Sequence, residues 1–191
     1  KLILKKMQIF NEKQQNLAHR INEDTTLKNW KDWKWQLKHS VKSIDKFEMV
    51  SGIKFSDEKR KSLEETLEKF PLSITPYYIS LIDIDNYEND PVFKQSFADQ
   101  RELITNSSEF SDPLAEDKDS PVEGITHRYP DRVLFHVSNV CSMYCRHCTR
   151  KRKVGDCDSI PDRETVEKGL EYIRRTPRAR APGRRRQPAL A

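Results

Sequence analysis

The sequence lacks an apolar run long enough to cross a membrane, which needs roughly 18 residues. Its longest apolar stretch, residues 133–140, is interrupted by three polar residues: His136, Ser138 and Asn139. The amino terminus lacks the longer apolar segment and the small-residue cleavage site of a secretory signal. We therefore expect a protein without a membrane segment that is located in the cytoplasm.

An excess of charge of one sign is also missing from most of the chain. The 191 residues carry 35 Lys and Arg against 30 Asp and Glu, which gives a net charge of +5. Residues 178–191 contain five arginines and no acid, so the rest of the chain is neutral. A basic tail can bind nucleic acid, but this Arg-, Ala- and Pro-rich tail differs in composition from the body. We interpret it as an aberrant junction, from a frameshift or from foreign DNA, and expect no specific nucleic-acid partner.

The four cysteines are few, and they are not spread along the chain as a disulfide framework requires. Three of them lie within eight residues: Cys141, Cys145 and Cys148. Clustered thiols in a chain without a secretory signal predict a metal site in a reducing compartment. The remaining one, Cys157, is expected to be an ordinary thiol.

Hydrophobic periodicity predicts helices in the first part of the chain. One stripe recurs at three- and four-residue spacing: Leu27, Trp30, Trp33, Leu37 and Val41. It predicts a helix with Trp30 and Trp33 facing the core and Trp35 pointing away. A second helix is expected to begin near Ser56, which can cap it, and to stop before Pro71.

A different pattern begins near residue 132. The β-branched and aromatic run of residues 133–137 predicts a buried strand. Pro161 is well placed to start a helix, whose apolar face consists of Val166, Leu170 and Ile173. Strand, cysteine loop and helix form one βα unit. Its cysteines would lie at the carboxyl end of the strand, where α/β barrels place their chemistry.

These patterns predict an α/β chain, mainly α-helical, with four parts. They are a helical region (1–110), a linker and loop (111–131), the βα unit with its cysteine loop (132–177) and the aberrant tail (178–191).

The spacing Cys-x-x-x-Cys-x-x-Cys leaves two kinds of metal site open. Three thiolates can hold three corners of a [4Fe–4S] cubane, and the fourth iron then binds a small molecule. Zinc is the alternative, but its structural sites usually have four ligands, so Cys157 or His147 would have to complete the set. One hypothesis for the function of the chain is therefore a zinc-stabilised module that binds nucleic acid through the basic tail.

A series of motifs occurs in a fixed order along the chain, from about residue 26 to Pro177. They are Trp30-x-x-Trp33-x-Trp35-Gln36, Ile74-Thr75-Pro76-Tyr77-Tyr78, Asp90-Pro91-Val92, Asp112-Pro113-Leu114, the segment 126–135 (THRYPDRVLF) and the segment 141–150 (CSMYCRHCTR). This series resembles the lysine 2,3-aminomutase family of radical S-adenosylmethionine (SAM) enzymes.

The resemblance implies an isomerase that moves the 2-amino group of an amino acid to carbon 3. Its cofactors would be a [4Fe–4S] cluster, SAM and pyridoxal phosphate (PLP), which carry the chemistry. The family fold is a partial (βα) TIM-like barrel behind a helical region, and this chain would be a truncated amino-terminal part, inactive by itself. The run from Lys151 to Asp156 looks weakly closer to the glutamate 2,3-aminomutase branch. The implied partners are the amino-acid substrate, an electron donor of the flavodoxin or ferredoxin type, and further copies of the full-length protein in a homo-oligomer.

The resemblance also implies roles for single residues. The cluster ligands would be Cys141, Cys145 and Cys148. The other cofactor-binding residues would be His147 beside the cluster and, around the PLP phosphate, Arg128, Tyr129 and Arg132. Arg150 matches the arginine that receives the substrate carboxylate. No catalytic residue is assigned, because the lysine that holds PLP in the family lies beyond the point of divergence.

The arginines also have simpler interpretations. Guanidinium groups suit phosphate because they form bidentate, charge-assisted bonds. Without the resemblance, however, Arg128 and Arg132 would be expected to form surface ion pairs with Asp119 or Asp131. Arg150 would likewise be one member of a solvated basic run.

Overall fold

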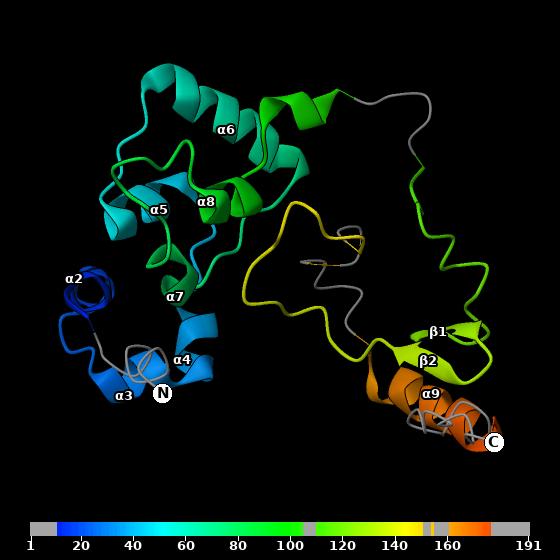
Figure 1. Cartoon of the computed structure of the whole chain (residues 1–191). Coiled ribbons are helices and arrows are strands. Elements are labelled where there is room, and N and C mark those ends of the chain that lie inside the picture. The colour runs from blue at the N-terminus through cyan, green and yellow to red at the C-terminus, as the bar shows by residue number, and fades with distance from the viewer. Residues whose placement is uncertain (1–10, 105–109, 151–153, 155–160, 177–191) are drawn as a thin grey trace, which may run out of the picture. The chain divides into compact units, whose positions relative to one another are not determined.

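The computed structural model describes residues 11–104, 110–150, 154 and 161–176 (Figure 1). The chain divides into two compact units. Unit 1 consists of residues 1–107 and 141–151, and unit 2 consists of residues 108–140 and 152–191. The cysteine loop therefore groups with the helical region, whereas the sequence had suggested that it groups with the strand and helix on either side of it.

Unit 1 is built from short helices. They are α2 (Glu12–Ile21), α3 (Leu27–Lys31), α4 (Trp33–Lys38), α5 (Ile44–Ser51), α6 (Asp57–Lys69), α7 (Pro76–Ile79), α8 (Pro91–Ser96) and the 3-10 helix η1 (Gln100–Leu103). The predicted start of α6 is confirmed, because the Ser56 side chain accepts a hydrogen bond from the backbone N–H of Lys59. Its end before Pro71 is confirmed as well. Within the described residues, no helix is both long and apolar enough to cross a membrane.

The predicted tryptophan helix is broken in two. The Asp32 carboxylate accepts a hydrogen bond from the backbone N–H of Lys34 at 3.0 Å and so begins a new helix, α4. Trp30 is buried, but Trp33 is 65% exposed. Trp35 packs against the core, with its ring centroid 6.0 Å from that of Trp30. The expectation for Trp33 and Trp35 was wrong, because the break at Asp32 shifts the phase of the helical pattern.

An aromatic cluster forms much of the core of unit 1. The rings of Phe93 and Phe97, from α8 and its end, stack with centroids 4.5 Å apart. Phe47 of α5 meets Phe97 edge-on at 4.6 Å and is fully buried. Such packing fixes α8 against α5, and α8 carries residues that contact the cysteine loop.

Unit 2 contains an antiparallel hairpin. Strand β1 (Ile125–Tyr129) pairs with β2 (Arg132–Phe135), and the pairing is irregular between Thr126 and Tyr129. The predicted strand is present, but it is not buried, because exposed and half-buried residues alternate along β2. One-sided burial is typical of an antiparallel hairpin, whereas strands buried on both faces belong to parallel sheets. The family barrel remains a prediction.

Helix α9 (Arg163–Arg175) completes unit 2 and confirms the helix expected after Pro161. The Asp162 carboxylate caps it by accepting a hydrogen bond from the backbone N–H of Thr165 at 2.7 Å. The ring of Phe135 lies against Gly169, where a Cβ atom would be only 2.6 Å from its Cε2. The absence of a side chain at this position therefore lets β2 and α9 approach closely.

Candidate cofactor site

The three clustered cysteines share one loop of unit 1. Cys141 is exposed, Cys145 and Cys148 are half-buried, and the N–H of Cys148 donates to the carbonyl of Cys145 at 3.1 Å. Burial raises the pKa of Cys141, and the nearby Cys148 and Cys145 thiols raise it further. Among the described residues, three or more His, Cys, Asp or Glu side chains nowhere gather closely enough to hold a metal. As a donor set, three soft thiols within eight residues nevertheless fit an iron–sulfur cluster.

The backbone of the cysteine loop is hydrogen-bonded to the helical part of unit 1. The N–H of Thr75 donates to the carbonyl of Ser142 at 3.0 Å, and the N–H of Tyr144 donates to the carbonyl of Ser73 at 2.8 Å. These bonds place Met143 opposite Ile74, which also pairs with Val41 on its other side. The loop therefore extends a small antiparallel bridge that begins in the helical region.

The side chain of Met143 anchors the cysteine loop to the hydrophobic core of unit 1. It packs against the hydrophobic core of unit 1, and its sulfur accepts a hydrogen bond from the Ser96 hydroxyl at 2.9 Å. Ser96 ends α8 and is itself buried. An apolar residue between the first two cysteines therefore holds the loop on the core.

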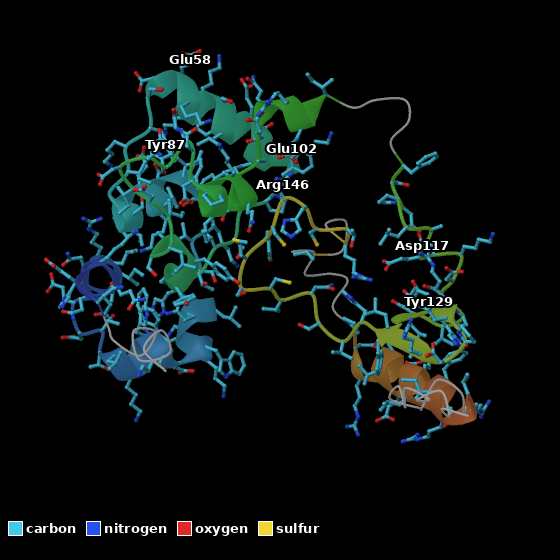
Figure 2. All side chains as sticks on the ribbon, viewed as in Figure 1. Glu58, Tyr87, Glu102, Asp117, Tyr129 and Arg146 are labelled. Carbon is cyan, nitrogen blue, oxygen red and sulfur yellow. The ribbon has the colours of Figure 1, made fainter. Side chains whose placement is uncertain are left out.

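Arg146 holds the loop on its other side. Its Nε donates to Glu102 at 2.9 Å, and a second bond joins these two side chains, both labelled in Figure 2. Its guanidinium lies 4.4 Å from the centroid of the Phe70 ring. The backbone N–H of Arg146 also donates to the carbonyl of Gln95 at 2.8 Å. The Arg146 side chain is only 13% exposed, so it is largely shielded from water, whereas Glu102 is 28% exposed. The roles of Met143, Arg146 and Glu102 could not be recognised from the sequence, because no local pattern links the loop to η1.

The candidate phosphate residues lie together on the hairpin of unit 2. Arg128 donates from Nε to Asp119 at 2.7 Å and from a terminal nitrogen to the carbonyl of Leu114. The hydrogen bond that Arg128 donates to Asp119 raises the pKa of Arg128 above its ordinary value. Arg132 lies over the Tyr129 ring at 4.5 Å.

Both ion pairs that the simpler interpretation expected are present. Arg128 pairs with Asp119 at 2.7 Å, and Nη1 of Arg132 lies 3.7 Å from Asp131. Each arginine remains partly exposed, at 40% for Arg128 and 66% for Arg132. Both guanidinium groups are therefore accessible to an anion while they hold these partners.

The two remaining candidates belong to unit 1. His147 is exposed and Arg150 is half-buried. The half-burial of Arg150 differs from the solvated basic run of the simpler interpretation, whose neighbouring residues 151–153 lie outside the described residues. Cys157, which could complete a zinc site, and the tail of residues 178–191 also lie outside them.

Comparisons with known proteins identify close relatives of the chain. No family model matches it. The chain is 52% identical over 155 residues to an L-lysine 2,3-aminomutase of Methanococcus maripaludis, which covers 81% of this chain and 36% of that protein. It is 41% identical over 165 residues to an L-lysine 2,3-aminomutase of Clostridium subterminale, covering 86% and 39% of the two chains. It is 33% identical over 171 residues to a glutamate 2,3-aminomutase of Clostridioides difficile, and this match covers 90% of this chain and 39% of that protein.

The chain thus spans somewhat more than a third of the length of these relatives. The matches nevertheless extend over more than four fifths of the chain itself. They therefore include most of the helical region as well as residues of unit 2. The chain belongs to the lysine 2,3-aminomutase family.

Proposed function

We propose that this chain contributes the cluster loop and the phosphate-binding hairpin of a radical SAM, PLP-dependent amino-acid 2,3-aminomutase. The observation that carries the proposal is the 52% identity over 155 residues to an enzyme named L-lysine 2,3-aminomutase. The three cysteines on one loop supply a matching donor set for a [4Fe–4S] cluster. When bound, the cluster and SAM supply radical chemistry, and PLP activates the migrating amino group.

The cysteine loop contributes metal binding. Cys141, Cys145 and Cys148 would bind iron as thiolates, so cluster assembly must remove their protons. Because the pKa of Cys141 is raised, loading should become easier as the pH increases. Arg146 and Met143 hold the loop on unit 1, which keeps the thiols on a rigid support.

The arginines contribute anion binding. Arg128 and Arg132 would bind the phosphate of PLP, with the exposed Tyr129 between them along the hairpin. Arg150 would receive the carboxylate of the substrate as a bidentate partner. His147, between two cluster ligands, would lie beside the cluster.

Lysine is the proposed substrate. Identities of 52% and 41% to two lysine enzymes exceed the 33% to a glutamate enzyme. This difference supports lysine over the glutamate branch that the run from Lys151 to Asp156 had weakly suggested. A flavodoxin- or ferredoxin-type electron donor, a homo-oligomer and a cytoplasmic location complete the proposal.

Anaerobic reconstitution with iron and sulfide tests the proposal on this chain. We expect a brown protein with about four irons per chain, and loss of the iron when Cys141, Cys145 or Cys148 is replaced by Ala. Cys157→Ala is the matched control and should retain full iron content. Stoichiometric zinc instead of iron would show that the site is a closed zinc site. Equal loss of metal from Cys157→Ala would show that Cys157 is a fourth ligand, which would contradict the open cluster.

A further inference from the structure

Asp119 is tied to strand β1 by two adjacent bonds. Its carbonyl accepts the N–H of His127 at 2.8 Å, and its carboxylate accepts Nε of Arg128 at 2.7 Å. Its own N–H donates to the carbonyl of Glu116 at 3.1 Å, which closes a turn before it. These backbone hydrogen bonds hold the main chain at Asp119 in place and so restrict the position of its carboxylate.

The guanidinium of Arg128 is held along one edge. The Asp119 carboxylate accepts a hydrogen bond from Nε, and the carbonyl of Leu114 accepts one from a terminal nitrogen. A guanidinium has five N–H donors in a rigid fork, so donors remain for a ligand on the edge away from these two partners. The side chain is 40% exposed, which makes that edge reachable.

The second arginine of the hairpin is held differently. Nη1 of Arg132 lies 3.7 Å from the Asp131 carboxylate, beyond hydrogen-bond distance, and both side chains are more than half exposed. The two Asp–Arg pairs therefore share their chemistry but differ in geometry. Asp119 restrains its arginine, whereas Asp131 does not.

We propose that Asp119 is a positioning residue that presents the free edge of Arg128 to the phosphate group of PLP. This inference rests on the proposed function. A guanidinium that is already oriented loses less side-chain freedom on binding a ligand, so it binds more tightly than a mobile one. Asp119 lowers the net positive charge near the phosphate, but a phosphate on the free edge of Arg128 would have the guanidinium between it and the carboxylate, so we expect orientation to outweigh this effect.

The test compares two ligands that differ only in the phosphate. Pyridoxine 5′-phosphate and pyridoxine lack the aldehyde, so neither forms imines with the lysines of the chain. Calorimetric titration of the full chain should show tighter binding of the phosphate ester. Asp119→Asn should weaken binding of the ester by about fivefold to tenfold, the scale of one charge-assisted hydrogen bond. Binding of pyridoxine should not change.

Asp131→Asn is the matched control, since it removes the same charge from the carboxylate that pairs with the other arginine of the hairpin. It should change the affinity for the ester by less than about twofold. Equal effects of Asp119→Asn and Asp131→Asn would show that only net charge matters and would overturn the positioning role. Tighter binding by Asp119→Asn would overturn it too, because the carboxylate would then compete with the phosphate.

A further variant separates this inference from the function on which it rests. If Arg128→Ala binds the ester as well as the wild-type chain, or if the wild-type chain does not prefer the ester, the phosphate site itself is wrong. If Arg128→Ala loses the preference but Asp119→Asn retains it, only the role of Asp119 is wrong. If Asp119→Asn does not fold, Asp119→Glu replaces it, because it keeps the charge on a longer side chain. The positioning role requires that Asp119→Glu weaken binding of the ester and leave binding of pyridoxine unchanged.

Discussion

Glu102 and Arg146 lie 44 residues apart in sequence, yet their side chains meet with Nε of the arginine 2.9 Å from the carboxylate. Arg146 follows Cys145 directly, so this pair fixes the path of the loop between the second and third cysteines. The Phe70 ring covers the guanidinium. The position of the cysteines in unit 1 therefore depends on a glutamate of η1.

The first prediction concerns this pair. Glu102→Gln should lower the free energy of unfolding of unit 1 by about 1–3 kcal/mol, because it leaves a shielded guanidinium without its counter-charge. Tryptophan fluorescence during urea unfolding measures this, since all three tryptophans belong to unit 1. Arg101→Gln breaks the pair with Asp99, in which Arg101 is 87% exposed, and should cost clearly less stability at neutral pH than Glu102→Gln. Equal costs for the two variants would contradict the shielding argument.

The second prediction concerns Met143. Met143→Ala removes a half-buried side chain from the core and leaves the Ser96 hydroxyl without its sulfur partner. We expect a loss of about 1–2 kcal/mol, below the range for fully buried Met. Met49→Ala, at a position 45% exposed, serves as the control and should change stability by about 0.5 kcal/mol or less. The same urea titration compares them, and a larger loss from Met49→Ala would refute the anchoring role.

The third prediction concerns the contact between β2 and α9. Alanine normally stabilises a helix relative to glycine by about 1 kcal/mol, but at Gly169 the new Cβ would collide with Phe135. We expect Gly169→Ala to destabilise unit 2 by about 1–2 kcal/mol, as overpacking does. Amide hydrogen exchange in α9 reports the change. In a Phe135→Leu background the same substitution should become neutral or stabilising, and persistence of the full loss there would rule out the collision.

The fourth prediction concerns pH. The hydrogen bonds from Arg101 lower the pKa of Asp99 from 3.8 to about 2. A carboxyl group whose pKa is lowered by folding stabilises the folded state above its ordinary pKa, and this contribution is lost as the pH falls from near 4 to near 2. NMR titration of the Asp99 carboxyl group should give a midpoint near 2, and Arg101→Gln should raise it. An unchanged midpoint in Arg101→Gln would show that the arginine is not the cause.

Local chemistry explains which elements could be predicted from the sequence. The Ser56 side chain and Pro71 bound α6 through short-range effects, and both were recognised. The tryptophan stripe failed because a single capping residue, Asp32, interrupts a pattern whose spacing continues across it. Periodicity shows how apolar residues are spaced, but it does not show whether a capping residue divides them between two helices.

The environment of the candidate site was less predictable, because it depends on contacts between distant segments. The cysteines and arginines could be named from the motifs they form. Their supports, Ser73, Ser96 and Glu102, belong to segments with no signal of their own. Strand β1 was missed for a related reason, since its polar residues, such as Thr126 and His127, resemble those of a loop.

The small bridge that joins Val41, Ile74 and Met143 has a consequence for the order in which the chain folds. A growing chain presents Val41 and Ile74 long before Met143, and the cost of closing a loop increases with its length. Tyr144 and Arg146 likewise form their bonds to Ser73 and Gln95 only after all of the hairpin has been synthesised. The helical part of unit 1 should therefore fold first on the ribosome, with an open edge at Ile74. The cysteine loop would then be the last segment of unit 1 to join it.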